Sequence, residues 1–239
     1  MTTPATARPQ DRINAYWTGR APEYDDYQQR PERRAHDRAA WAEVFGGALP
    51  PPPAQVLDLG TGSGYVALLL AELGHDVTAT DLSEGMLARA RAHAARGDRA
   101  PRFLQGDAVE PAYPDDSFDA ITSRYLMWTL REPERALAAW RRLLRPGGVL
   151  ALVDSTWFPT GLDRDTAPDF VALYDAEVRA QLPLAAASSI DATRDLVAGA
   201  GFADVTLTPL TTILELDRRF GVAPDHEVRL QFLLTARRA

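Results

Sequence analysis

The chain has 239 residues, of which 46% are hydrophobic, and a formal net charge of -7. A chain of this length can bury one substantial core, and its excess of negative charge disfavours binding to nucleic acid, which needs basic groups against the phosphates. No cysteine is present, so disulfides, thiolate metal sites and cysteine nucleophiles are excluded. All 26 basic residues are arginine, and without lysine there is neither Schiff-base chemistry nor a Walker phosphate loop.

The sequence also bears on the location of the protein. The first 20 residues lack the apolar core of a signal peptide, and no apolar run approaches the roughly 18 residues of a membrane span. We therefore expect a cytoplasmic monomer or homodimer with no membrane partner, no nucleic-acid partner and no metal.

The N-terminal segment is polar with scattered aromatic residues. Apolar residues recur at helical spacing in it, at Ala35, Ala39, Ala40, Val44 and Phe45, which predicts two or three helices over residues 10–47. We expect residues 1–50 to form a helical cap or lid within a single domain of residues 1–239.

From Gln55 onward, short apolar runs alternate with amphipathic stretches, which is typical of βαβ units. We expect helices over 65–73, between Ser83 and Gly97, from Pro133 to Leu144, over 169–181 and over 191–200. The expected strands are residues 56–59, 76–80, 102–104, 118–122, 149–153, 204–212 and 227–236. This order predicts an α/β fold with a doubly wound, mainly parallel, seven-stranded Rossmann-like sheet. Residues 54–154 would bind a cofactor, residues 156–190 would be inserted beside the acceptor, and residues 191–239 would complete the sheet.

A glycine-rich turn follows the first predicted strand. Gly60, Gly62 and Gly64 alternate with other residues and open an apolar helix. Glycines allow backbone to pass close to a ligand in conformations that a Cβ would obstruct. Such a turn is also common without any ligand, so this motif needs support from elsewhere in the sequence.

Two carboxylates supply that support. Asp81 ends the second predicted strand about 20 residues after the glycines, where a carboxylate reaches ribose hydroxyls. Asp107 follows the third strand and would lie at the same edge of the sheet. Either carboxylate could instead serve a cap or a turn, although Ser83 fits the helix cap better than Asp81 does. The three features together predict one elongated cofactor site.

Four segments in this order resemble the class I S-adenosylmethionine-dependent methyltransferases of the bacterial small-molecule type. They are VLDLGTGSGYVALLLAELGHDVTATDLSEGMLARAR, FLQGDA, PDDSFDAITSRYLMWTL and LRPGGVLALVD, and they cover roughly residues 54–154. The resemblance implies S-adenosyl-L-methionine as cofactor. It implies that the three glycines contact its methionine part, that Asp81 holds the ribose, that Leu82 meets the adenine face, and that Asp107 and Ala108 meet the adenine amino group.

The same resemblance implies roles for further residues. Asp58 would order the glycine loop, and Thr61, Met86 and Gly106 lie within the matching motifs and join the expected cofactor site. Residues after the fourth strand would face the reactive end of the cofactor; these are Ser123, Arg124, Tyr125 and Trp128. The segment from Ala15 to Asp25 is similar to the opening helix of many small-molecule members, so Tyr24 would close over the cofactor carboxylate, with Tyr16 and Arg20 as further candidates. Aromatic residues at these spacings are equally compatible with ordinary helix packing.

Methyl transfer from a sulfonium needs alignment in a dry site and no dedicated catalytic residue. A base helps only where the acceptor is a hydroxyl or a protonated amine. The candidate bases are His36 in the cap and Asp154 at the end of the fifth strand, and His226 remains near the last strand. Trp128, Trp157 and Phe158, with Tyr125, are candidates for an apolar acceptor pocket.

The expected function is methyl transfer to an oxygen, nitrogen or carbon of a small molecule. A nicotinamide-dependent oxidoreductase is an alternative, although its G-x-G-x-x-G spacing differs from the spacing of Gly60, Gly62 and Gly64. A non-catalytic protein that binds the cofactor for regulation is a second alternative.

Overall fold

Seven strands form one sheet in the computed structural model, which describes residues 7–97, 99–158, 168–223 and 227–239. They are β1 (Gln55–Leu59), β2 (Asp76–Asp81), β3 (Arg102–Gln105), β4 (Phe118–Arg124), β5 (Leu144–Asp154), β6 (Phe202–Pro209) and β7 (Phe232–Arg238). Their order is β3-β2-β1-β4-β5-β7-β6, and β7 runs antiparallel to both β5 and β6 while the other pairs are parallel. This topology confirms the predicted doubly wound, mainly parallel sheet.

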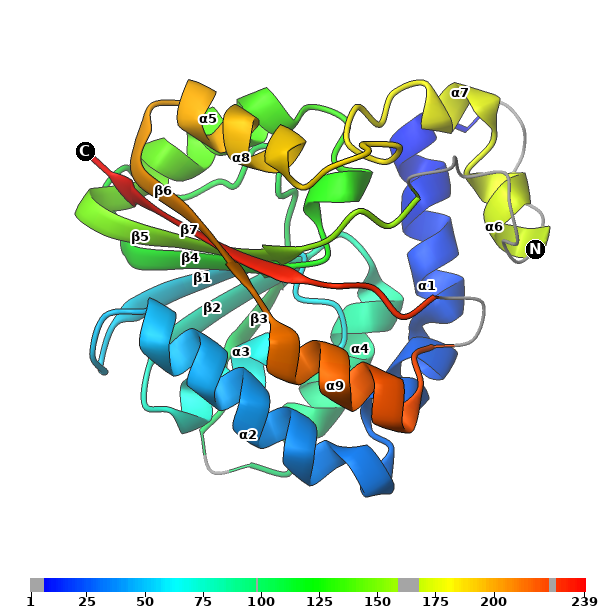
Figure 1. Ribbon diagram of the computed structural model, residues 1–239, viewed down its shortest axis with the longest axis horizontal. Coiled ribbons are helices and arrows are strands. Elements are labelled where there is room, and N and C mark those ends of the chain that lie inside the picture. The colour runs from blue at the N-terminus through cyan, green and yellow to red at the C-terminus, as the bar shows by residue number, and fades with distance from the viewer. Residues whose placement is uncertain (1–6, 98, 159–167, 224–226) are drawn as a thin grey trace.

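Helices cover both faces of the sheet (Figure 1). One face carries α5 (Pro133–Leu143) and α8 (Asp191–Gly199), and the other carries α2 (Pro31–Ala48), α3 (Tyr65–Glu72), α4 (Glu84–Ala94) and α9 (Thr211–Phe220). The remaining helices, α1 (Pro9–Gln28), α6 (Pro168–Leu173) and α7 (Ala176–Arg179), lie beyond one end of the sheet (Figure 1). Among the described residues, no helix is both long and apolar enough to cross a bilayer.

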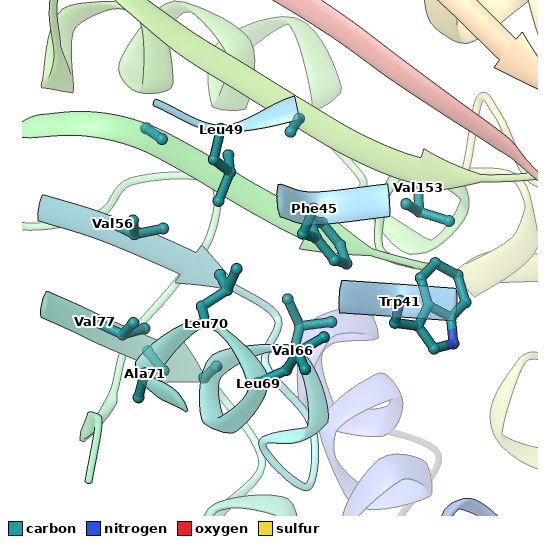
Figure 2. Packing of buried hydrophobic residues seen from close by; sticks show 14 of the residues in the cluster. Trp41, Phe45, Leu49, Val56, Val66, Leu69, Leu70, Ala71, Val77 and Val153 are labelled. Carbon is teal, nitrogen blue, oxygen red and sulfur yellow. The ribbon is translucent and has the colours of Figure 1, made fainter. Parts of the chain in front are cut away.

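The two N-terminal helices differ in how they pack. Trp41 and Phe45 of α2 are almost completely buried and belong to the same cluster as Val66, Leu70 and Val153 (Figure 2). Helix α2 is therefore part of the core of the sheet, and the expectation of a lid over the whole of residues 1–50 does not hold for it. The reason is that α2 carries a continuous apolar stripe at positions 40, 41 and 45, and this stripe is buried.

Helix α1 instead lies across the end of the sheet, where Ile13 and Tyr16 pack in a separate apolar cluster and polar contacts join the helix to its neighbours. The Thr18 hydroxyl lies 2.9 Å from the hydroxyl of Ser83, which caps α4. The Asp25 carboxylate lies 2.8 Å from Nε2 of His93. At its other end, the buried Arg12 guanidinium reaches Asp175 beside α7 at 2.5 Å. These contacts join α1 to α4 and to the inserted segment.

Several element boundaries differ from the sequence prediction, and strand β7 begins at Phe232 instead of at Glu227. The helix expected over 169–181 is divided into α6 and α7, because Asp175 accepts a hydrogen bond from Val178 N and begins a new helix. Strand β5 begins at Leu144, before the two glycines, instead of at Val149. Helix α9 was missed, since a strand was expected to run on to residue 212.

Candidate functional site

A cavity of about 530 Å³ opens where the strand order reverses between β1 and β4. Residues from α1, α2, the glycine loop and the ends of β2, β3 and β4 line it, together with the 3-10 turn Met127–Thr129, α6 and the chain after α9. Ligands of doubly wound sheets bind at such a reversal, outside the carboxyl ends of the strands. The volume suits a small molecule or a cofactor.

The glycine loop forms one wall of this cavity. Gly60 and Gly62 line it and have φ values of +63° and +57°, which residues with a side chain rarely adopt. A Cβ on Gly60 would lie 2.8 Å from Leu126 Cδ1. The loop backbone therefore lines the cavity at these two positions, and the absence of a Cβ on Gly60 leaves room for Leu126.

Asp81 lies beside the loop and lines the cavity. Its carboxylate accepts hydrogen bonds from Gly62 N and Ser83 N, each at 2.8 Å. Burial raises the pKa of Asp81, and the backbone N–H groups around it lower the pKa in part. Each oxygen has a second lone pair, so a rigidly held carboxylate remains able to accept hydroxyl groups of a ligand.

The ends of β2 and β3 continue this wall. Leu82, Gly106, Asp107 and Ala108 all line the cavity, and so does Met86 from α4. Asp107 accepts a hydrogen bond from Val109 N at 2.8 Å, which orders the turn. The structure thus brings together the carboxylates that the sequence placed at successive strand ends.

Four predicted cofactor residues lie behind the cavity wall, not in it. Gly64 has a φ of +85°, and a Cβ there would lie 2.9 Å from Ala90 Cβ and 3.0 Å from Phe103 Cζ. The third glycine therefore allows α3 to pack against α4 and β3. Thr61 is buried, and its N–H donates to Thr80 O at 2.9 Å.

Asp58 and Ser123 are the other two. Thr122 donates to Asp58 Oδ1 at 2.7 Å, and Ser123 donates to Leu59 O at 2.9 Å, so both contacts join β4 to β1 below the glycine loop. Burial raises the pKa of Asp58 to about 6. These contacts agree with an ordering role for Asp58 and give Ser123 the same kind of role.

The predicted residues of α1 reach the cavity. Tyr16, Arg20 and Tyr24 line it. Arg20 forms an ion pair with Glu23 at 2.8 Å, and the Tyr24 ring packs edge-on to Trp17 at 5.8 Å between centroids. Burial raises the pKa of the Tyr24 hydroxyl, which favours its neutral form. Tyr24 can therefore donate a hydrogen bond into the cavity.

An aromatic wall completes the cavity. Trp128 packs against Phe158 at 5.3 Å between ring centroids, and Phe158 stacks on Phe170 of α6 at 5.6 Å. Trp157 packs edge-on to Tyr125 at 4.9 Å. All four residues predicted for an acceptor pocket line the cavity, namely Tyr125, Trp128, Trp157 and Phe158.

Neither candidate base lines the cavity. His36 lies on the exposed side of α2 and stacks on Phe220 at 5.5 Å, because the other side of the helix faces the core. Asp154 is buried and accepts hydrogen bonds from Ser155 N and Trp157 Nε1. Burial raises the pKa of Asp154 to about 7. Asp154 therefore holds Trp157 in place, and His226 lies outside the described residues.

The cavity also contains a buried polar network that the sequence did not reveal. The Arg33 guanidinium lies 2.6 Å from both Asp37 and Asp217, and Gln231 connects Asp217 to the hydroxyl of Tyr125. Burial alone would lower the pKa of Arg33, but the two carboxylates raise it. Arg33 and Asp217 are 184 positions apart, so no local pattern could pair them. Trp41 of α2 also lines the cavity and was not among the residues predicted from the sequence.

Comparisons with known proteins agree with this geometry. A family model described as "Methyltransferase domain" matches residues 57–152. The chain is 35% identical over 185 residues to a demethylmenaquinone methyltransferase of Clavibacter sepedonicus, which covers 71% of this chain and 74% of the relative. Three further bacterial demethylmenaquinone methyltransferases match over 53%, 59% and 49% of their own length.

Solved structures show the same fold. An S-adenosylmethionine-dependent methyltransferase from Mesorhizobium loti is similar with a TM-score of 0.59 and 25% identity, over 85% of this chain and 100% of that one. The [4+2]-cyclase SpnF is similar with a TM-score of 0.66 and 20% identity, over 99% of this chain and 98% of that one. The family model and the bacterial relatives favour a methyltransferase over a nicotinamide-dependent oxidoreductase. The chain therefore belongs to the class I S-adenosylmethionine-dependent methyltransferases.

Proposed function

We propose that this chain transfers a methyl group from S-adenosylmethionine to a small aromatic acceptor of the quinol class. The observation that carries the proposal is the joining, in one cavity, of a glycine and carboxylate wall with a wall of aromatic rings. The named activities of several relatives, which act on demethylmenaquinone or in ubiquinone and menaquinone biosynthesis, support this acceptor class.

The residues of the first wall fit the cofactor. Asp81 would accept the ribose hydroxyls with its remaining lone pairs, and the bare backbone of Gly60 and Gly62 would lie beside the methionine part. Asp107 and Ala108 would meet the adenine edge. Each of these contacts uses a group that the structure already holds in place and that faces the cavity.

The cofactor supplies a methyl group on a positively charged sulfur, which is transferred by in-line displacement. The protein contributes alignment and the exclusion of water, which are the main sources of rate for such a reaction. Helix α1 covers the cavity with Tyr16, Trp17 and Tyr24. Asp154 contributes indirectly, because it orients the indole of Trp157.

The acceptor would stack against the rings of the second wall. Trp128 and Phe170 are buried, and Phe158 contacts both rings and lines the cavity with them. Planar aromatic molecules gain both burial of apolar area and favourable ring geometry in such a wall.

The test is turnover of a defined acceptor. Purified protein would be incubated with S-adenosylmethionine and 2-prenyl-1,4-naphthoquinol under reducing conditions, and mass spectrometry would follow the methylated quinol and S-adenosylhomocysteine. We expect both products in equal amounts. The Trp128→Ala variant should turn over slowly and still bind S-adenosylhomocysteine. If the protein binds S-adenosylhomocysteine but the quinol yields no product, the acceptor class is wrong.

A further inference from the structure

Arg124 is a cation with no ion-pair partner among the residues that the structure describes. It ends β4 and lines the cavity, and its guanidinium carbon lies over three aromatic rings, 5.1 Å from Trp41 and 4.8 Å from both Tyr65 and Tyr125. Ring faces attract a cation, but they accept few of the five N–H donors of a guanidinium. The three rings therefore hold the guanidinium in place without accepting most of its hydrogen bonds.

The other arginines of the cavity wall are paired. Arg20 pairs with Glu23, Arg33 with Asp37 and Asp217, and Arg229 with Glu227. For Arg124, the described residues offer neither a carboxylate at ion-pair distance nor a hydrogen-bond acceptor for the guanidinium. Burial lowers the pKa of Arg124, yet the surrounding tyrosines and Asp37 raise it more, so the group stays charged. A buried charge of this kind is stabilised when an anion binds.

We propose that Arg124 binds an anionic oxygen of the acceptor, a carboxylate or a phenolate carried on an aromatic ring. This rests on the proposed function and narrows its acceptors to acidic aromatic molecules. Two sources could supply an oxyanion, since the methionine part of the cofactor also has a carboxylate. The ring contacts favour the acceptor as the source of the oxyanion. Tyr125 contacts both the Arg124 guanidinium and Trp157, and so connects Arg124 to the aromatic wall.

The guanidinium also gives this contact a chemical consequence. Its fork can donate two parallel hydrogen bonds to a carboxylate. Beside a phenol, a fixed positive charge lowers the phenol pKa and stabilises the phenolate, which is the better nucleophile. A phenol bound in this way releases its proton to solvent as it binds, so the methyl transfer needs no separate base, in agreement with the placement of His36 and Asp154 outside the cavity wall.

The test compares two probes with the same ring system, of which one carries an anionic group and the other a neutral group. Protein saturated with S-adenosylhomocysteine would be titrated calorimetrically with 2-naphthoate and with the neutral 2-naphthalenemethanol. We expect the wild type to bind the naphthoate at least tenfold more tightly, and Arg124→Gln to lose this preference. Arg124→Lys should retain part of it, and Arg229→Gln, which removes an ion-paired cation from the same wall, should retain it fully. If the Gln variant is unfolded in a thermal scan, Arg124→Met, which keeps the apolar stem against the rings, takes its place.

A second titration separates the two sources of the oxyanion. S-Adenosylhomocysteine contains the amino-acid carboxylate, and 5′-methylthioadenosine lacks it. We expect Arg124→Gln to bind both with wild-type affinity. A loss of at least tenfold for S-adenosylhomocysteine alone would assign Arg124 to the cofactor and overturn the proposal, as would equal or absent binding of the two naphthalene probes to the wild type. Neither titration depends on turnover, so a failure of quinol methylation would leave this result independent.

Discussion

Gly64→Ala tests the claim that the third glycine of the loop serves packing and not cofactor contact. The new Cβ would lie 2.9 Å from Ala90 Cβ and 3.0 Å from Phe103 Cζ, and Ala90 is fully buried on α4. The left-handed backbone adds about 1–2 kcal/mol for a non-glycine residue, and overpacking adds about 1–3 kcal/mol. We therefore expect the free energy of unfolding to fall by about 2–5 kcal/mol, the sum of these two effects.

Gly147→Ala is the matched control. Gly147 has a φ of +76°, but a Cβ there would meet nothing within 4 Å, so only the backbone effect remains. Urea unfolding followed by tryptophan fluorescence measures both losses. Gly64→Ala should lose about 1–3 kcal/mol more than the control, and its folded form should bind S-adenosylhomocysteine like the wild type. Equal losses would refute the packing argument, and an intact stability with lost binding would show that Gly64 contacts the cofactor.

Three further predictions concern the cavity and its surroundings. Asp81→Ala should weaken the binding of S-adenosylhomocysteine by about 1.5–3 kcal/mol in calorimetry, which is the value of a charged hydrogen bond. Asp76→Ala, at the exposed other end of β2, should change this binding little. Because burial raises the pKa of Asp154 to about 7, the folded state binds this proton more tightly than the unfolded state, so stability should fall as pH rises from about 4 to 7. Asp154→Asn should flatten this decline in the urea midpoint. A variant with the same pH profile of the urea midpoint as the wild type would contradict the prediction. Hydrogen exchange should show that S-adenosylhomocysteine protects α1 but leaves the core helix α2 unchanged; equal protection of α1 without ligand would make it a fixed cap.

The fold could be predicted because its signals are local. The alternation of strands and helices from β1 to β5 lies in contiguous apolar runs, and each helix has its own start or stop residue, as Ser83 shows for α4. The sequence prediction missed helix α9 for the same reason, because it relied on local signals. Its first residues, Thr211, Thr212 and Ile213, are β-branched and follow a strand directly, so local preference favoured a longer strand. Tertiary packing decides otherwise, since Ile213 is buried in the cluster under α2.

The wall of the cavity formed by the glycine loop and Asp81 could be predicted for a similar reason. The glycine loop and Asp81 lie within a single βαβ unit, so sequence spacing fixes their geometry. The aromatic and polar part of the cavity is assembled from segments that are far apart in the sequence. Arg33 forms an ion pair with Asp217, which lies near the other end of the chain, and two of the rings around Arg124 come from α2 and α3. Gly64 differs from the other two glycines of the motif, because it serves packing while Gly60 and Gly62 line the cavity.

Calorimetric titration of the wild-type protein with S-adenosylhomocysteine tests the central claim, that the cavity between α1 and the glycine loop holds the methyl donor. The account predicts saturable binding at one site per chain and no binding of NADH under the same conditions. Saturable binding of NADH together with no binding of S-adenosylhomocysteine would contradict it.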